Sequence, residues 1–116
     1  YARREGRNPR IDLLRLHGVA MAVATDCNPG TSPVLSPTLM MSMACTLFGL
    51  TPEEALAGMT RNAARALGLQ DEIGTVAAGK AADLCVWRVS RPAELPYWVG
   101  MPGPERRFFA GEDAPP

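Results

Sequence analysis

One carboxylate, Asp26, lies where a short apolar run meets a tight polar loop. Val19, Met21 and Val23 alternate along the run and predict a short buried strand. The sequence Asn-Pro-Gly at positions 28–30 forbids continuation of this strand, because proline fixes its own φ and lacks a backbone donor. Asp26 is therefore expected at the carboxyl end of a strand. In parallel α/β folds ligands and catalytic groups gather at that edge, so Asp26 is the first candidate for chemistry.

The single histidine is the second candidate, and its position favours a structural role. His17 directly precedes Gly18, which is expected to end a short helix, and the negative end of the helix dipole favours an imidazolium there. A metal-ligand role would require His17 at the same strand edge as Asp26. His17 precedes the strand instead and falls at its opposite end, so we expect no ligand role for it.

Three cysteines offer thiols for metal or redox chemistry, but their number and spacing do not favour it. Cys27, Cys45 and Cys85 are odd in number, widely spaced and set among apolar residues. Disulfide frameworks and zinc knuckles need paired cysteines at particular spacings. We therefore expect three reduced thiols that pack in the core.

Four short helices are expected around the loop, because N-cap residues precede the apolar stretches and glycines that end helices follow several of them. Asparagine or serine followed by proline marks two of the helix starts, since the side chain caps the first turn and proline fits within it. Thr51 and Glu54 have the spacing of a capping box at a third start. The expected helices span residues 9–17, 37–48, 52–59 and 60–67.

From Gln70 onward the pattern changes from helical to β. Two strands are expected at 73–76 and 82–87, joined by a glycine-containing turn, and the second is apolar on both faces, which predicts burial. Lys80 and Asp83 flank the turn, where a surface ion pair would have a structural role only. The remaining expectations are a helical turn at 94–99, a strand at 106–110 and a frayed end from 111 onward.

The composition and charge restrict the classes of partner. Hydrophobic residues make up 47% of the 116 residues and charged residues 21%, which is enough for a folded core. Twelve basic residues balance twelve acidic ones, so nothing favours nucleic acid or an anionic membrane as a partner. No apolar run reaches the roughly 18 residues of a membrane helix, and the N-terminus lacks the apolar core of a signal peptide. We expect a soluble, cytoplasmic chain that begins within a longer protein.

Several of these stretches together resemble one enzyme family. Residues 24–33, 43–48 and 50–55 are similar to imidazolonepropionases, which belong to the metal-dependent amidohydrolases. Residues 60–68 and 79–84 are similar to amidohydrolases in general, so these two segments indicate the fold and not the substrate. The specific signal is the sequence Thr-Asp-x-Asn-Pro-Gly in the loop.

The resemblance implies an α/β fold, namely the C-terminal part of a (β/α)₈ amidohydrolase barrel with strands of the small β-sandwich beside it. It covers most of this chain but only the last third or less of such an enzyme. Residues 1–69 would supply the last helix-strand-helix units of the barrel, residues 70–111 the β-sandwich strands, and residues 112–116 a disordered tail. Barrel strands without a barrel expose their edges, so we expect the chain to form a homo-oligomer.

The resemblance also implies a reaction and a site. Imidazolonepropionases hydrolyse the ring C–N bond of 4-imidazolone-5-propanoate to N-formimidoyl-L-glutamate in histidine degradation, with one bound zinc or iron ion. By this resemblance Asp26 is both a metal ligand and a catalytic residue, and Asn28, Gly30 and Thr31 contact the substrate. The chemistry agrees, since a carboxylate beside a metal-bound water can accept its proton. An amide, a glycine backbone and a hydroxyl suit a polar heterocycle.

The chain departs from the family in its histidines. The family's other metal ligands are histidines, two of them spaced as His-x-His, whereas this chain has a single histidine. One carboxylate is too small a ligand set to hold zinc. We therefore expect this chain alone to bind no metal ion and to be inactive, although the parent protein would be an enzyme with a small-molecule substrate.

Two alternatives stay open at this point. Another amidohydrolase, such as a deaminase or a dihydroorotase-like enzyme, would share the helical and Gly-Lys segments but not the loop. A non-catalytic binding or scaffold domain is the second alternative. In such a domain the histidines would have been lost, whereas in a piece of an enzyme they would lie upstream of this chain. The loop also has a plain structural interpretation, because asparagine, proline and glycine are common in turns.

Overall fold

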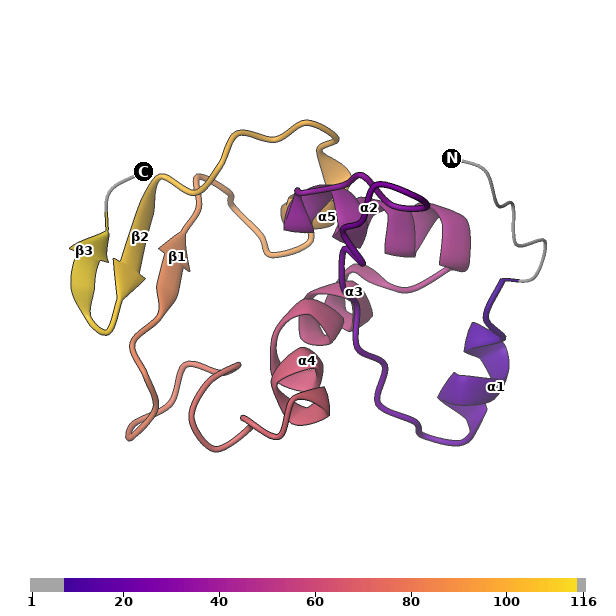
Figure 1. Cartoon of the computed structure of the whole chain (residues 1–116), viewed down its shortest axis with the longest axis horizontal. Coiled ribbons are helices and arrows are strands. Elements are labelled where there is room, and N and C mark those ends of the chain that lie inside the picture. The colour runs from indigo at the N-terminus through magenta and orange to yellow at the C-terminus, as the bar shows by residue number, and fades with distance from the viewer. Residues whose placement is uncertain (1–7, 115–116) are drawn as a thin grey trace.

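Helices occupy one part of the molecule and a small sheet the other (Figure 1). The computed structural model describes residues 8–114. The sheet and α1 lie at opposite ends of the longest axis, with the other helices between them. The elements are α1 (Ile11–Leu16), α2 (Pro37–Phe48), α3 (Pro52–Met59), α4 (Arg61–Ala66), β1 (Leu84–Val86), α5 (Glu94–Tyr97), β2 (Arg106–Phe109) and β3 (Glu112–Ala114).

The helix boundaries follow the capping signals of the sequence. Ser36 caps α2 by accepting a hydrogen bond from the Leu39 backbone N–H at 3.2 Å, and Gly49 ends the helix with a φ of 73°. Thr51 and Glu54 form the predicted capping box of α3, each side chain accepting from the other's backbone N–H. The four predicted helices are confirmed as α1 to α4, with ends shifted by at most two residues. None of the described helices is long and apolar enough to cross a membrane.

The core lies where α2, α3 and α5 meet. Its buried apolar members come from both of the longer helices, from the turn between them and from α5, which lies about 40 residues further along the chain. Thr38 and Ser42 of α2 are buried as well, and no described buried side-chain polar atom lacks a hydrogen-bond partner. The apolar core residues are Met41, Ala44, Leu50, Ala55 and Leu95.

The three strands form an antiparallel sheet in the order β1, β2, β3. Leu84 of β1 pairs with Phe108 of β2, which confirms the predicted strand at 106–110 and places β1 within the predicted strand at 82–87. The predicted burial of β1 is wrong, because Cys85 and Val86 are exposed. No helix among residues 8–114 packs extensively on this sheet.

The end of the chain also differs from the prediction of a disordered tail. Glu112 pairs with Phe109, so residues 112–114 form β3. Ala110 and Gly111 connect the strands with φ values of 51° and 85°, the signature of a two-residue hairpin turn that follows the twist of the strands. Residues 115–116 of the predicted tail lie outside the described residues.

The predicted strand at 19–23 does not form. This segment runs from α1 past α3 and α4 toward α2 without a neighbouring strand (Figure 1). Two backbone hydrogen bonds tie it to helices, from the Val19 N–H to the Leu14 carbonyl of α1 at 2.9 Å and from the Val23 N–H to the Gly58 carbonyl of α3 at 3.0 Å. A strand requires a ladder partner, and residues 8–114 place none beside this segment.

The predicted strand at 73–76 does not form either. The Lys80 ammonium donates to the carbonyls of Gln70 and Ile73, which curls this stretch around the lysine. The ion pair considered between Lys80 and Asp83 is not among the ion pairs of residues 8–114. Asp83 instead accepts a hydrogen bond from the Ala110 N–H at 2.8 Å and supports the β2–β3 turn.

The three cysteines are free thiols, as predicted, but they are not all core residues. Cys27 and Cys85 are exposed, and only Cys45 is half-buried. Burial raises the pKa of the Cys45 thiol, and the negative charges of Glu53 and Glu54 raise it further. The thiol of Cys45 therefore stays protonated and packs as a small apolar group.

Candidate functional site

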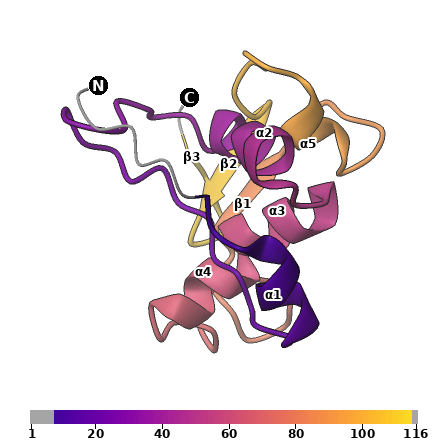
Figure 2. The same cartoon turned by 90° about the vertical axis from the view of Figure 1, so that its right-hand side faces the viewer.

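The loop that carries Asp26 projects from the helices and is closed by its own hydrogen bonds (Figure 2). Asn28 and Ser32 form an antiparallel bridge, with 2.9 Å between the Asn28 nitrogen and the Ser32 carbonyl oxygen. The Ser32 hydroxyl donates to the Thr25 carbonyl at 2.6 Å. Because these contacts join the two ends of segment 25–32, the loop keeps its shape without a neighbouring strand.

The side-chain amide of Asn28 lies at the centre of the loop. Its Oδ1 accepts from the backbone N–H groups of Gly30 and Thr31 at 2.9 Å and 2.8 Å. Its Nδ2 donates to the Asp26 carbonyl at 2.6 Å and lies 3.3 Å from the Asp26 carboxylate oxygen Oδ2. The structure therefore brings together all four residues predicted as the site, and Asn28 contacts each of the others.

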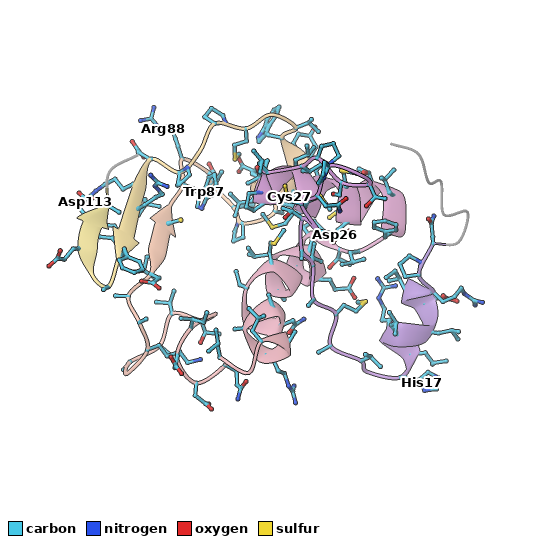
Figure 3. All side chains as sticks on the ribbon, in the orientation of Figure 1. His17, Asp26, Cys27, Trp87, Arg88 and Asp113 are labelled. Carbon is cyan, nitrogen blue, oxygen red and sulfur yellow. The ribbon has the colours of Figure 1, made fainter. Side chains whose placement is uncertain are left out.

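Asp26 has an unusual backbone conformation for a residue with a side chain. Its φ is 48°, in the left-handed region where aspartate and asparagine are enriched but other L-residues are rare. The residue is exposed, so its carboxylate is open to a ligand (Figure 3). The geometry thus presents one accessible carboxylate from a loop whose shape is determined by hydrogen bonds.

Two residues of the helices hold the segment that leads to Asp26, and neither is predicted from the sequence. The Asn62 side chain donates to the Met21 carbonyl at 2.9 Å. A Cβ on Gly58 would lie 2.7 Å from Cγ2 of Val23, so only glycine admits the segment this close to α3. The available signal was a glycine just before the end of α3. Glycine within a helix costs up to about 1 kcal/mol relative to alanine, which is typical of a position where another segment approaches closely.

A pair of charged residues ties α1 to the start of α3. Arg15 donates to both carboxylate oxygens of Glu54, at 2.8 Å and 2.7 Å, and its Nη2 also lies 3.2 Å from the Gly49 carbonyl oxygen. The hydrogen bond from Arg15, supported by the backbone N–H of Thr51, lowers the pKa of the Glu54 carboxyl to about 2. This carboxylate therefore has a structural role in helix capping and packing.

His17 occupies the C-terminal end of α1, as predicted. It is exposed and lies at the far end of segment 19–23 from Asp26 (Figure 3). The structure thus separates the histidine from the candidate site, and His17 does not share a centre with Asp26.

An apolar groove of about 380 Å³ lies between α1, segment 19–24 and α2. None of its lining residues carries a titratable group, so it offers nothing for acid–base chemistry. Residues that line the groove include Ile11, Leu14, Met21, Met40, Phe48 and Leu50.

The described residues do not by themselves fit a metal centre. Residues 8–114 contain no group of three or more histidine, cysteine, aspartate or glutamate side chains that could hold a metal ion. Protein zinc centres take three or more such ligands. Asp26 can supply one carboxylate ligand, and any complete centre needs partners from elsewhere.

The amidohydrolase family profile matches residues 2–110. The chain therefore belongs to the amidohydrolase family. A solved structure of an amidohydrolase from Thermotoga maritima is similar to this one, with a TM-score of 0.66 and 31% sequence identity over 89% of this chain and 24% of that chain. These matches confirm the predicted fold class, part of an α/β amidohydrolase.

Curated relatives give a finer similarity. The chain is 64% identical over 113 residues to the imidazolonepropionase of Pseudomonas paraeruginosa and 60% identical over 112 residues to that of Serratia proteamaculans. It is 58% identical over 112 residues to the imidazolonepropionase of Maricaulis maris. Each match covers 97% of this chain and 28% of the relative, so the chain spans little more than a quarter of their length. The predicted resemblance to imidazolonepropionases is thereby confirmed.

Proposed function

We propose that this chain forms the C-terminal part of an enzyme that hydrolyses the ring C–N bond of 4-imidazolone-5-propanoate to N-formimidoyl-L-glutamate, a step of histidine degradation. The observation that carries the proposal is the loop, in which Asp26, Asn28, Gly30 and Thr31 are joined by hydrogen bonds around one exposed carboxylate. The similarity to imidazolonepropionases over 97% of the chain supports this choice of reaction over that of another amidohydrolase.

Asp26 has the central role in this proposal. Its exposed carboxylate would be one ligand of a single zinc or iron ion, whose other ligands come from outside residues 8–114. The same carboxylate can accept a proton from an attacking water. Thr31, exposed at the loop, and the backbone at Gly30 would form the wall that faces the small-molecule substrate.

The proposal also covers the kind of partner, the oligomeric state and the location of the enzyme. A balanced charge of twelve basic and twelve acidic residues supports a small-molecule substrate and not nucleic acid or a membrane as the partner. Segment 19–23 has no strand beside it among residues 8–114, which supports association into a homo-oligomer. We place the enzyme in the cytoplasm, in line with its free thiols.

The test uses a chimera, the imidazolonepropionase of Pseudomonas paraeruginosa in which residues 2–110 of this chain replace the matching segment. At 64% identity the chimera is expected to fold and to hydrolyse 4-imidazolone-5-propanoate, measured by formation of N-formimidoyl-L-glutamate. The unmodified relative is the control. A folded chimera that leaves this substrate untouched, or that hydrolyses a different cyclic amide instead, would contradict the proposal.

The isolated 116-residue chain provides the complementary test. With zinc or iron added it is expected to show no hydrolysis, because its described residues supply too few ligands for a metal centre. Turnover of 4-imidazolone-5-propanoate by the purified chain would show that it forms a working site alone.

A further inference from the structure

The segment that leads to the candidate site is held by the end of α3 and the start of α4. The Asn62 side-chain nitrogen Nδ2 donates to the Met21 carbonyl at 2.9 Å. Two residues further along the segment, the Val23 N–H donates to the Gly58 carbonyl at 3.0 Å. Gly58 has no Cβ, which would lie 2.7 Å from Val23 Cγ2, so this part of the chain lies directly against α3.

The backbone that carries Asn62 is closely packed. Thr60, between α3 and α4, has a φ of −118° and a ψ of −98°, and its hydroxyl donates to the Leu56 carbonyl at 2.7 Å. Gly74 approaches the same junction so closely that an added Cβ would lie 2.5 Å from Ala64 Cβ and 3.2 Å from the Thr60 carbonyl oxygen. Asn62 lies in the first turn of α4 and therefore extends from a well-supported point.

This support matters because segment 19–23 has no strand beside it among residues 8–114. Met21 and Val23 pack half-buried side chains against the core, but apolar packing is not directional. A hydrogen bond has a preferred distance and angle, so the bond from Asn62 fixes where the Met21 carbonyl lies. Asp26 follows Val23 by three residues, and a shift of the segment would therefore move the carboxylate with it.

We propose that Asn62 is a positioning residue for the reaction. Its amide determines where segment 19–23 lies against α3 and, through that segment, where the carboxylate of Asp26 lies. Asn62 itself contacts neither the substrate nor a metal ion. The part that concerns catalysis rests on the proposed function of Asp26, whereas the hold of Asn62 on the segment rests on the contacts of this chain alone.

The first experiment follows segment 19–23 by NMR in the isolated 116-residue chain. The carbonyl ¹³C shift of Met21 reports its hydrogen bond, and the NOE between the Val23 methyl and the Gly58 Hα reports the approach of the segment to α3. Asn62→Ala removes the whole amide, and Asn62→Asp keeps the size of the side chain but loses the donor. Both variants are expected to move the Met21 signal upfield and to weaken the NOE. A variant that loses the hydrogen bond but keeps the full NOE would overturn the proposal.

The control is Thr51→Ala, at the opposite end of α3 from Gly58. It removes a helix cap and is expected to lower stability about as much as the loss of one hydrogen bond does. Because Thr51 is not bonded to segment 19–23, the Met21 signal and the NOE are expected to stay unchanged. Equal changes in this variant would assign the effect to lowered stability and overturn the role of Asn62.

The second experiment measures kinetics in the chimera. Asn62→Ala and Asn62→Asp are expected to lower kcat by about tenfold to a hundredfold, because a small misplacement of a catalytic group is costly. KM is expected to change by less than about threefold, and Thr51→Ala is expected to keep kcat within about twofold of the parent. A raised KM at unchanged kcat, or an equal loss of kcat in Thr51→Ala, would overturn the proposal.

Two further outcomes are distinguishable from these. If neither Asn62 variant of the chimera folds, Asn62 is a residue of general stability and the proposal is overturned. Failure of the proposed function would show instead as normal turnover in Asp26→Asn. The NMR result would then still decide whether Asn62 holds segment 19–23, while the catalytic part of the proposal would fall with the role of Asp26.

Discussion

The helical core and the segment that carries Asp26 are built on different principles. In the core, each helix has its own start and stop signals, and α2, α3 and α5 bury one another's apolar faces. Segment 19–23 has apolar alternation but no strand beside it among residues 8–114, so it is held by contacts with the helices: hydrogen bonds involving Gly58 and Asn62, and packing of Met21 and Val23 against the core. Local signals therefore suffice for a capped helix, whereas a strand forms only beside a neighbouring strand.

The largest effect is expected in the core. Leu95 is 7% exposed and joins α5 to α2 and α3, so Leu95→Ala is expected to lower the free energy of unfolding by about 3 kcal/mol through the cavity it leaves. Urea unfolding of the 116-residue chain measures this. Leu35→Ala is the control, because Leu35 is 84% exposed and its truncation is expected to cost less than about 0.5 kcal/mol. Equal effects of the two variants would refute the assignment of the core.

The next effect concerns the contact between core and segment. Gly58→Ala places a Cβ 2.7 Å from Val23 Cγ2 and is expected to destabilise by about 1 kcal/mol, since overpacking outweighs the gain in helix propensity. Increased amide exchange at Val23 would show that the segment has moved away from α3. Gly103→Ala, where an added Cβ meets nothing within 4 Å, is the control. A stabilised Gly58→Ala variant would contradict the close approach.

A similar effect is expected at the start of α3, inside the helical region. Thr51→Ala removes one half of the capping box and is expected to destabilise the chain by about 1 kcal/mol, measured by urea unfolding. Thr31→Ala, in the loop, is the comparison, since its backbone N–H contact with Asn28 is retained. If the loop variant lost more stability than the cap variant, the contrast between the two regions would fail.

The smallest effect is the pH dependence of the contact between α1 and α3. Arg15 lowers the pKa of Glu54 to about 2 in the folded chain, below its ordinary value near 4.3 in the unfolded chain. The unfolded state binds the proton more readily, so this contribution is complete above about pH 4.5 and is lost as the pH falls toward 2. Glu54→Gln keeps the capping pattern and is expected to remove this part of the pH dependence. An unchanged acid profile in that variant would contradict the assignment.

The contrast between the two regions also explains what the sequence could predict. Ser36, Gly49, Thr51 and Glu54 act within a few residues of one another, so α2 and α3 are correctly placed from sequence. The strand at 19–23 was predicted from alternation, which indicates a buried face but not the presence of a partner. The strand at 73–76 failed for a similar reason, because Lys80 satisfies carbonyls that a neighbouring strand would otherwise take.

The loop motif predicts four candidate residues but not their internal arrangement, and their roles stay predictions. The motif around Asp26 gave four residues, and the structure brings them together. The left-handed φ of Asp26 and the contacts of the Asn28 amide with Asp26, Gly30 and Thr31 are features of the structure that the sequence analysis did not predict. The support from Asn62 links residues 41 positions apart, which is a tertiary contact and has no local signal.

The most direct test of the central claim is the turnover of Asp26→Asn in the chimera, alongside the unmodified chimera. Asparagine has nearly the same shape as aspartate and tolerates the left-handed backbone, so the variant is expected to fold and melt like its parent. It is expected to hydrolyse 4-imidazolone-5-propanoate slower by about a thousandfold or more, because the ionised carboxylate is lost. A rate within about tenfold of the parent would contradict the assignment of Asp26 as the catalytic carboxylate.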